Sequence, residues 1–366
     1  MHFAGLCAII FSKGSNAYCT FIEPEQVSGY CFVSGSGGFG RNTIRKKNMS
    51  REGRKEESKK MKQGFDDIMA RVKKCAKKTV SVSVAQDSAV LEAVKEAKAR
   101  GIADAILVGD EGKIREIAAQ IGMDLTDYEI IDEPDMIAAS LKAVKLAHEG
   151  KADMYMKGII DTKDFLKSVL DKEVGLRTGK PLSHVAVFEV PGIDRLLFLT
   201  DVAFMTYPTL EDKVHIIENT IPVCNACGIE MPKVAPLAAV EVVNPKMPAT
   251  VEAAELTKMC QEGRISGCVI DGPLSLDLAV DPEAAKHKGA TDRKIQGDAD
   301  VLLFPDIHAG NLVYKAIVHM VDMRNGCILT GTKVPVILTS RSDSFETKVN
   351  SIALAAVVSE ELQKQG

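Results

Sequence analysis

The sequence predicts an α/β protein with mostly parallel β-sheets and helices on both faces. From Lys77 onward, runs rich in β-branched residues alternate with segments whose apolar residues recur at helical spacing. Such βαβ repetition is typical of parallel strands joined by crossover helices. The 366 residues are enough for two domains with ordinary cores.

The first block of elements begins with a strand at residues 79–85. The helix that follows can be capped by Asp87 or Ser88 and stops at Gly101. The block continues with a strand at 103–110, a helix at 111–122, a strand at 128–132 and a helix at 134–150.

A second block contains further predicted strands, with helices between most of them. These strands cover residues 152–158, 184–190, 195–202, 234–240, 268–274 and 300–306. The segment from Cys327 to Ser340, followed by a long helix from about Ser344, is expected to return to the first block. We therefore predict a first domain of residues 61–151 plus 326–366, a second domain of residues 152–325, and a site in the cleft between them.

The first 60 residues differ from the rest. Segment 41–60 holds twelve charged residues in twenty and no apolar periodicity, which predicts disorder. Residues 35–40 fit the pattern G-x-G-x-x-G, but the helix that a dinucleotide site needs does not follow. The residues just before Met61 are almost all ones whose codons can be purine-only, as in a translated ribosome-binding sequence. We therefore expect residues 1–60 to lie upstream of the native start, which is Met61 or, as second choice, Met49; a real basic tail is the alternative.

Composition narrows the function classes. The net charge is -4, with +5 in residues 1–60 and -9 in the remainder. This negative charge argues against a nucleic-acid partner. No apolar run approaches the roughly 20 residues of a membrane span. The nine cysteines have no regular spacing, which indicates reduced thiols and a cytoplasmic location.

Three polar loops follow predicted strands, at residues 156–164, 304–315 and 339–344. Ligands of open α/β sheets bind outside the carboxyl ends of the strands, so the three loops are expected to face one cleft. In the second loop, Gly310 permits close backbone approach and Asn311 can cap a helix that begins at Leu312, with free N–H groups directed toward an anion. A capped helix with a solvated lysine is the alternative.

The third loop carries the strongest chemistry. Arg341 offers a planar donor fork suited to phosphate, and Ser340 offers a hydroxyl that can bond a nucleophile or an oxyanion. Asp343 and Glu346 are nearby carboxylates that could accept a proton. The alternative is an ordinary helix start, in which Ser342 or Asp343 caps and Glu346 completes a capping box.

Other motifs point away from metal, redox, kinase and serine-hydrolase chemistry. The CNAC segment at residues 224–227 lacks a second pair or a histidine at zinc-ligand spacing. The seven histidines form no H-E-x-x-H pair, and neither a Walker A motif nor G-x-S-x-G occurs.

Several segments, in this order, resemble the phosphate acyltransferases that use coenzyme A: residues 272–280, 283–289, 297–315 and 335–356. Residues 240–254 and 176–189 resemble the butyryl branch of the phosphate acetyl/butyryltransferase family more than the acetyl branch. The resemblance covers residues 61–366. It implies a two-domain fold like that of isocitrate and isopropylmalate dehydrogenases, an active site in the interdomain cleft, no metal and no bound cofactor, and a homo-oligomer.

The reaction that the resemblance implies exchanges coenzyme A, a substrate, for phosphate on a butyryl-sized acyl group. It assigns Ser340 to the thiol and Arg341 to phosphate and the tetrahedral intermediate. The predicted catalytic residues are Ser340, Arg341, Asp343 and Glu346, and the predicted phosphate- and substrate-binding residues are Thr162, Lys163, Asp306, Gly310, Asn311, Tyr314 and Lys315.

Two positions depart from the acetyl relatives. Thr347 stands where those relatives carry the general-base aspartate, so Glu346, which we favour, or Asp343 is expected to act as base. Ser168 stands where they carry a phosphate-binding arginine, and Lys163, Lys167 or Arg177 could substitute. Two competing functions are a same-fold decarboxylating dehydrogenase, which needs clustered aspartates for a divalent cation, and a non-catalytic acyl-CoA sensor. The acyl-chain preference is not encoded in these motifs.

Overall fold

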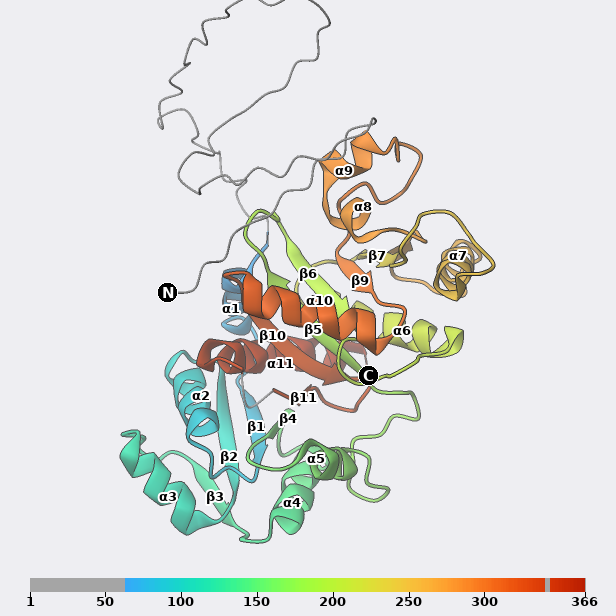
Figure 1. The fold of residues 1–366 in the computed structure, drawn as a ribbon. Helices are drawn as coiled ribbons and strands as arrows, with labels where there is room; N and C mark the ends of the chain where they lie inside the picture. Colours follow the sequence, from blue (N-terminus) through green and yellow to red (C-terminus); the bar gives the residue numbers. More distant parts are fainter. Residues whose placement is uncertain (1–62, 340–342, 366) are drawn as a thin grey trace, which may run out of the picture. The chain divides into compact units, whose positions relative to one another are not determined.

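The computed structural model describes residues 63–339 and 343–365, which contain one 11-stranded sheet with helices on both faces (Figure 1). The predicted leader, residues 1–60, lies outside the described residues. The strands are β1 (Lys78–Ser83), β2 (Ala103–Gly109), β3 (Glu129–Asp132), β4 (Met154–Lys157), β5 (Ser183–Glu189), β6 (Leu196–Thr200), β7 (Lys233–Pro236), β8 (Val269–Ile270), β9 (Val301–Leu303), β10 (Arg324–Thr330) and β11 (Val336–Ile337).

The strand order is β3-β2-β1-β4-β11-β10-β5-β6-β9-β7-β8. Parallel pairs make up both ends of the sheet, which confirms the predicted α/β class. The centre is antiparallel, because β10 pairs with β11 through a short connection and also pairs with β5 along its whole length. β11 then lies parallel to β4, a strand of the predicted second block, so this pairing does not test the predicted return of the chain to the first block.

The helices are α1 (Phe65–Val72), α2 (Ser88–Ala99), α3 (Glu111–Gln120), α4 (Met136–His148), α5 (Thr162–Val169), α6 (Leu210–Ala226), α7 (Pro248–Gln261), α8 (Leu276–Val280), α9 (Pro282–His287), α10 (Ile307–Met320) and α11 (Phe345–Gln365). Asp87 caps α2 by accepting a hydrogen bond from the backbone N–H of Val90 at 3.0 Å, which confirms one of the two predicted caps. In the part of the chain that the structure describes, no helix is long and apolar enough to cross a membrane.

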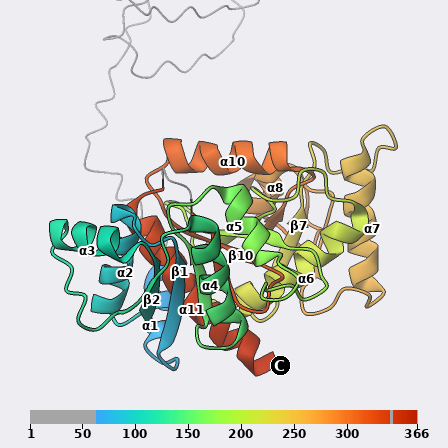
Figure 2. The ribbon, with the colours of Figure 1, turned by 90° about the horizontal axis from the view of Figure 1, so that it is seen from below.

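The two faces of the sheet are covered differently. On one face, side chains of α1, α2, α3, α6, α7 and α11 form a single hydrophobic core with the strands. On the other face there are two separate cores, one under α4 and α5 and one under α8, α9 and α10. α10 and α11 therefore lie on opposite sides of the sheet (Figure 2).

On the face with two cores, the core under α4 and α5 meets the core under α8, α9 and α10 at strands β5 and β10. Side chains alternate along a strand, so Val185 faces the single core while His184 shares the opposite face with Ala186. Leu329, which pairs with His184, belongs to the core under α4 and α5, whereas Cys327 belongs to the core under α10. A buried histidine thus lies where the two cores of this face meet. The predicted two-domain division remains a prediction.

Candidate active site

The carboxyl ends of β1, β4 and β11 surround a pocket of about 130 Å³ beside the first turn of α2. The lining residues are Asp87, Ala89, Val90, Lys157, Gly158, Thr339 and Lys348. Ligand sites of open α/β sheets lie at such strand ends. This pocket is therefore the starting point for the site.

The floor of the pocket depends on a close approach of β4 to β1. The N–H groups of Gly158 and Ile159 donate to the carbonyls of Ser83 and Val84 at 2.8 and 3.0 Å. A Cβ at Gly158 would lie 2.2 Å from the Val84 carbonyl oxygen, so only glycine fits there. Val84 itself has a φ of 53°, which is strained for a β-branched residue and is typical of functional sites.

Two lysines line the pocket although they are almost fully buried. Lys157 is 6% exposed and Lys348 is 3% exposed. Lys157 Nζ donates to the Gly158 carbonyl at 3.3 Å, and Lys348 Nζ donates to the Asp343 carbonyl at 2.7 Å. Sequence reasoning missed both lysines. The local signals are weak, because Lys157 lies at the end of a predicted strand and Lys348 stands just before the apolar stretch of the last helix, and neither position predicts a buried lysine.

The predicted Ser340–Arg341 pair lies outside the described residues. The residues that flank it can be placed: Thr339 lines the pocket, and the carbonyl of Asp343 accepts the hydrogen bond from Lys348. Both flanks of the predicted catalytic pair therefore contact this pocket or a residue that lines it.

The second predicted loop is built differently from our expectation. α10 begins at Ile307, and its cap is Asp306, whose carboxylate accepts hydrogen bonds from the N–H groups of His308 and Ala309 at 2.9 and 3.0 Å. The prediction that Asn311 caps a helix from Leu312 is therefore wrong. The helix starts earlier because the aspartate satisfies two N–H groups of its first turn.

The predicted binding residues that lie inside α10 make contacts with other parts of the same chain. Asn311 Nδ2 donates to the Val202 carbonyl at 2.9 Å. Gly310 does permit close backbone approach, but the partner is the carbonyl of Asp201, which a Cβ would approach to 2.5 Å. Tyr314 is buried, and Lys315 is half-buried beside its ring. Both come after the first turn of α10, because the helix begins at Ile307 and not at the predicted Leu312.

Thr162 and Lys163 form the exposed first turn of α5. Within the described residues, no hydrogen bond or ion pair joins either side chain to the pocket. Ser168 lies 2% exposed in a hydroxyl network with Ser140 and Tyr155, all three oxygens 2.9 Å apart. This buried position explains why an arginine in its place has no room here.

The buried side chain of His184 lies near two carboxylates, those of Asp201 and Asp343. The His184 N–H donates to Asp201 at 2.9 Å, while its side-chain Nδ1 has no hydrogen-bond partner among the described residues. Burial lowers the pKa of the His184 imidazole, and the nearby carboxylates of Asp201 and Asp343 oppose that shift. The pKa of Tyr314 is raised by burial and further by Cys327 and Asp343. The Asp343 carboxylate therefore lies within electrostatic reach of both side chains.

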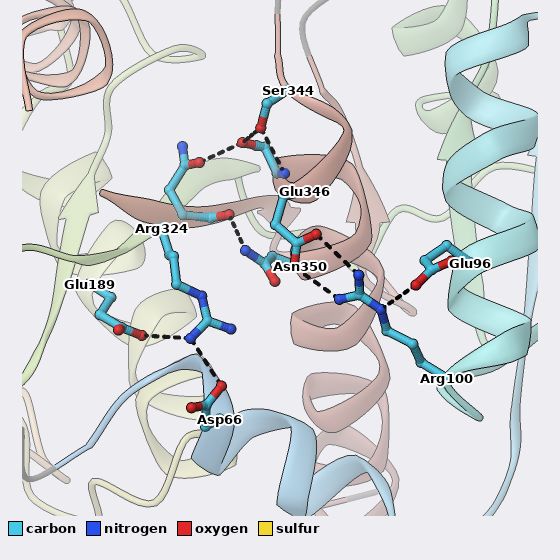
Figure 3. Close-up of polar contacts among 10 residues, drawn as sticks. Asp66, Glu96, Arg100, Glu189, Arg324, Ser344, Glu346 and Asn350 are labelled. Atoms are coloured by element: carbon cyan, nitrogen blue, oxygen red, sulfur yellow. Dashed lines mark hydrogen bonds and ion pairs between the residues drawn. The ribbon is translucent and has the colours of Figure 1, made fainter. Parts of the chain in front are cut away.

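Glu346 is held on the outer side of α11. Arg100 donates to both of its carboxylate oxygens, at 2.9 and 3.2 Å, and to Glu96 at 2.7 Å (Figure 3). The Glu346 side chain is 41% exposed. Its role as base remains a prediction, but this geometry directs the carboxylate toward the end of α2 rather than toward the pocket.

Thr347 anchors the start of α11. Its hydroxyl donates to Asn325 Oδ1 at 2.7 Å, its N–H donates to the Ser344 hydroxyl at 3.1 Å, and Asn350 Nδ2 donates to the Asn325 carbonyl at 3.1 Å (Figure 3). These contacts fix the helix start against β10. The position that carries an aspartate in the acetyl relatives is here a structural hydroxyl.

The CNAC segment ends α6. Cys224 and Cys227 are buried free thiols at the end of α6, and burial raises the pKa of both, that of Cys227 to about 12. Among residues 63–339 and 343–365, no group of three or more His, Cys, Asp or Glu side chains is placed to hold a metal ion.

The fold and the cation-lined pocket at parallel strand ends define an α/β protein that can bind an anion. The chain belongs to the phosphate acetyl/butaryl transferase family, which matches residues 65–138 and 133–356. The match includes every residue that lines the pocket.

The chain is similar to named acyltransferases over most of their length. It is 59% identical over 298 residues to the phosphate butyryltransferase of Clostridium acetobutylicum, covering 81% of this chain and 99% of that protein. It is 46% identical over 280 residues to the phosphate acetyltransferase of Thermotoga maritima, covering 76% of this chain and 95% of that protein. The predicted membership of the family is confirmed.

Solved structures show the same fold. A branched-chain phosphotransacylase from Enterococcus faecalis V583 matches with a TM-score of 0.67 and 36% identity, over 77% of this chain and 98% of that chain. A phosphotransacetylase from Staphylococcus aureus matches with a TM-score of 0.67 over 81% of this chain and 99% of that chain, and at 22% identity it supports the fold alone.

Proposed function

We propose that this protein is a phosphate butyryltransferase. It catalyses the reversible conversion of butanoyl-CoA and phosphate into butanoyl phosphate and CoA. The observation that carries the proposal is the 59% identity to the C. acetobutylicum phosphate butyryltransferase, against 46% to the T. maritima phosphate acetyltransferase. The alternative is another short or branched acyl group, which the E. faecalis branched-chain phosphotransacylase favours.

The reaction needs no metal, no bound cofactor and no covalent enzyme intermediate. In one direction a phosphate oxygen attacks the thioester carbonyl carbon, an oxyanion forms, and the C–S bond breaks as the thiolate leaves and takes a proton. In the other direction the thiol loses that proton to a base, the thiolate attacks the acyl phosphate, and phosphate leaves. Ser340 and Arg341 are the proposed donors to the thiol, the phosphate and the oxyanion.

Asp343 is the carboxylate that the geometry favours as the base. Glu346 faces Arg100 at the end of α2, whereas Asp343 lies within electrostatic reach of His184 and Tyr314 and close in sequence to the proposed Ser340–Arg341 pair. We also propose that the protein forms a homo-oligomer and that it acts in the cytoplasm.

The test is thiol release from butanoyl-CoA in the presence of phosphate and a chelator, repeated with acetyl-CoA and with a branched acyl-CoA. The proposal expects phosphate-dependent turnover that the chelator does not affect and a kcat/KM that is highest for butanoyl-CoA. A higher kcat/KM for acetyl-CoA or the branched substrate would change the acyl assignment. Tight acyl-CoA binding without turnover would identify a sensor, and turnover that needs a nicotinamide and a metal would identify a dehydrogenase.

A further inference from the structure

We propose that Lys157 and Lys348 form an anion subsite that holds a phosphate group of a substrate, either inorganic phosphate or a phosphate of coenzyme A. The inference rests on the proposed function and refines it, since neither lysine is among the binding residues predicted from the sequence. Both sources present the same chemistry, a small dianion with several acceptor oxygens.

The lining of the pocket has the charge that an anion requires. Two of its side chains are ammonium groups and one, that of Asp87, is a carboxylate. Each lysine is more than nine-tenths buried, so water screens the charge of both ammonium groups only weakly. An anion in the pocket would lie beside both ammonium groups.

The start of α2 adds to this field. α2 is 12 residues long, and its N-terminal end carries the positive pole of the helix dipole. Ala89 and Val90 in its first turn line the pocket, so the backbone end of the helix is directed at the same space as the two lysines. Asp87 accepts a hydrogen bond from Val90 N–H, so the carboxylate works as a cap as well as a charge.

The size and place of the pocket fit a phosphate group. A single water needs only about 10–15 Å³ of such space, and the pocket offers about 130 Å³. That volume admits a group larger than water but not a whole nucleotide. Along the chain, the proposed catalytic pair lies between Thr339, which lines the pocket, and Asp343, whose carbonyl accepts a hydrogen bond from Lys348.

Lys78 and Lys213 are also buried, and each binds a carboxylate outside the pocket. Lys78 Nζ lies 2.9 Å from Glu360 and bonds Gln363 at 2.7 Å. Lys213, which is 4% exposed on α6, bonds Glu252. Lys213 is therefore a suitable control for the loss of a buried ammonium that binds no substrate.

The experiment compares Lys157→Met, Lys348→Met and the control Lys213→Met, since methionine keeps the unbranched chain and removes the charge. The first readout is the rise in Tm that inorganic phosphate causes in the absence of acyl-CoA. The second is the KM for phosphate, for CoA and for dephospho-CoA, which lacks the 3′-phosphate. Loss of one charged hydrogen bond is expected to raise the relevant KM about tenfold or more.

The two possible ligands give different patterns. If the subsite holds inorganic phosphate, both pocket variants lose the phosphate-induced rise in Tm and show a raised phosphate KM, with the KM for CoA unchanged. If it holds the 3′-phosphate of CoA, the variants lose the preference for CoA over dephospho-CoA and keep the phosphate KM. Lys213→Met is expected to lower Tm in buffer while it leaves the phosphate-induced rise and all KM values unchanged.

A result in which both pocket variants keep wild-type affinities for phosphate and CoA overturns the inference. Lys348→Arg provides a check where Lys348→Met folds poorly, because it retains the charge and is expected to keep part of the affinity. The Tm readout needs no turnover, so it separates the inference from the proposed function. Phosphate binding that depends on the lysines in a protein without acyltransferase activity would refute the function and leave the subsite in place.

Discussion

The starts of α2 and α10 look alike in sequence and differ in what surrounds them. Each helix follows a strand and begins with an aspartate cap, Asp87 for α2 and Asp306 for α10. At α2, two buried lysines from β4 and α11 complete a pocket. At α10, the first turn carries His308, which bonds the hydroxyl of the exposed Tyr207 at 2.9 Å. A helix start becomes a strong candidate for anion binding when distant parts of the chain bring cations to it.

The largest effect is expected for Ser340→Ala, at the residue that follows Thr339 of the pocket beside α2. Loss of one oxyanion donor lowers kcat by about 100- to 1,000-fold. The measurement is kcat with butanoyl-CoA and saturating phosphate, together with circular dichroism to show an intact fold. A change in kcat below about threefold would remove Ser340 from the catalytic residues.

The second prediction distinguishes the two carboxylates. Asp343→Asn is expected to lower kcat by about 100-fold or more, the usual contribution of a general base, and to flatten the acidic limb of the pH–rate profile. Glu346→Gln is expected to change kcat by less than about threefold and to lower stability by at most about 1 kcal/mol, because it weakens a partly exposed ion pair. The reverse outcome would restore Glu346 as the base.

The third prediction concerns Lys315, the cation on α10. We expect Lys315→Met to raise the phosphate KM by less than about threefold, because the half-buried lysine lies 5.5 Å from the centre of the Tyr314 ring and works as a packed side chain. The phosphate KM of Lys348→Met is the internal comparison. A larger effect for Lys315→Met than for Lys348→Met would reverse the roles of the two helix starts.

The smallest effects are expected for Asp87→Asn and Asp306→Asn, a matched pair at the two caps. Asparagine caps helices about as well as aspartate, so both variants should keep Tm. Asp87→Asn removes the only carboxylate that lines the described pocket and is expected to lower the phosphate KM about two- to fivefold. Asp306→Asn is expected to leave it unchanged. Equal responses of the two variants would show that the pocket is not the anion site.

Much of the fold follows from patterns in the sequence, whereas the pocket does not. Asp87 was found because a cap is a local signal, and the alternation of strands and helices was found because apolar periodicity is local as well. Lys157 and Lys348 are 191 positions apart, and each reads as an ordinary solvated lysine until the fold brings them together. Burial of two cations is a tertiary property that no local pattern encodes.

The errors have physical causes as well. Asp306 and Asn311 are both good caps, and Gly310 between them disfavours a helix that passes through it. The tertiary contact with the Asp201 carbonyl requires that glycine and outweighs the local preference. The antiparallel centre was missed because apolar runs predict strands without their direction, and only the pairing of β10 with β5 and β11 sets it.

That central pairing also limits how the protein can move. The ladder between β5 and β10 runs without a break from Ser183–Thr330 to Glu189–Arg324, so a single hydrogen-bonded sheet passes through the region where the two cores of one face meet. A motion that separated β5 from β10 would have to break these hydrogen bonds, so the two strands are expected to move as one unit. Slow amide exchange along both strands is the measurement that checks this expectation.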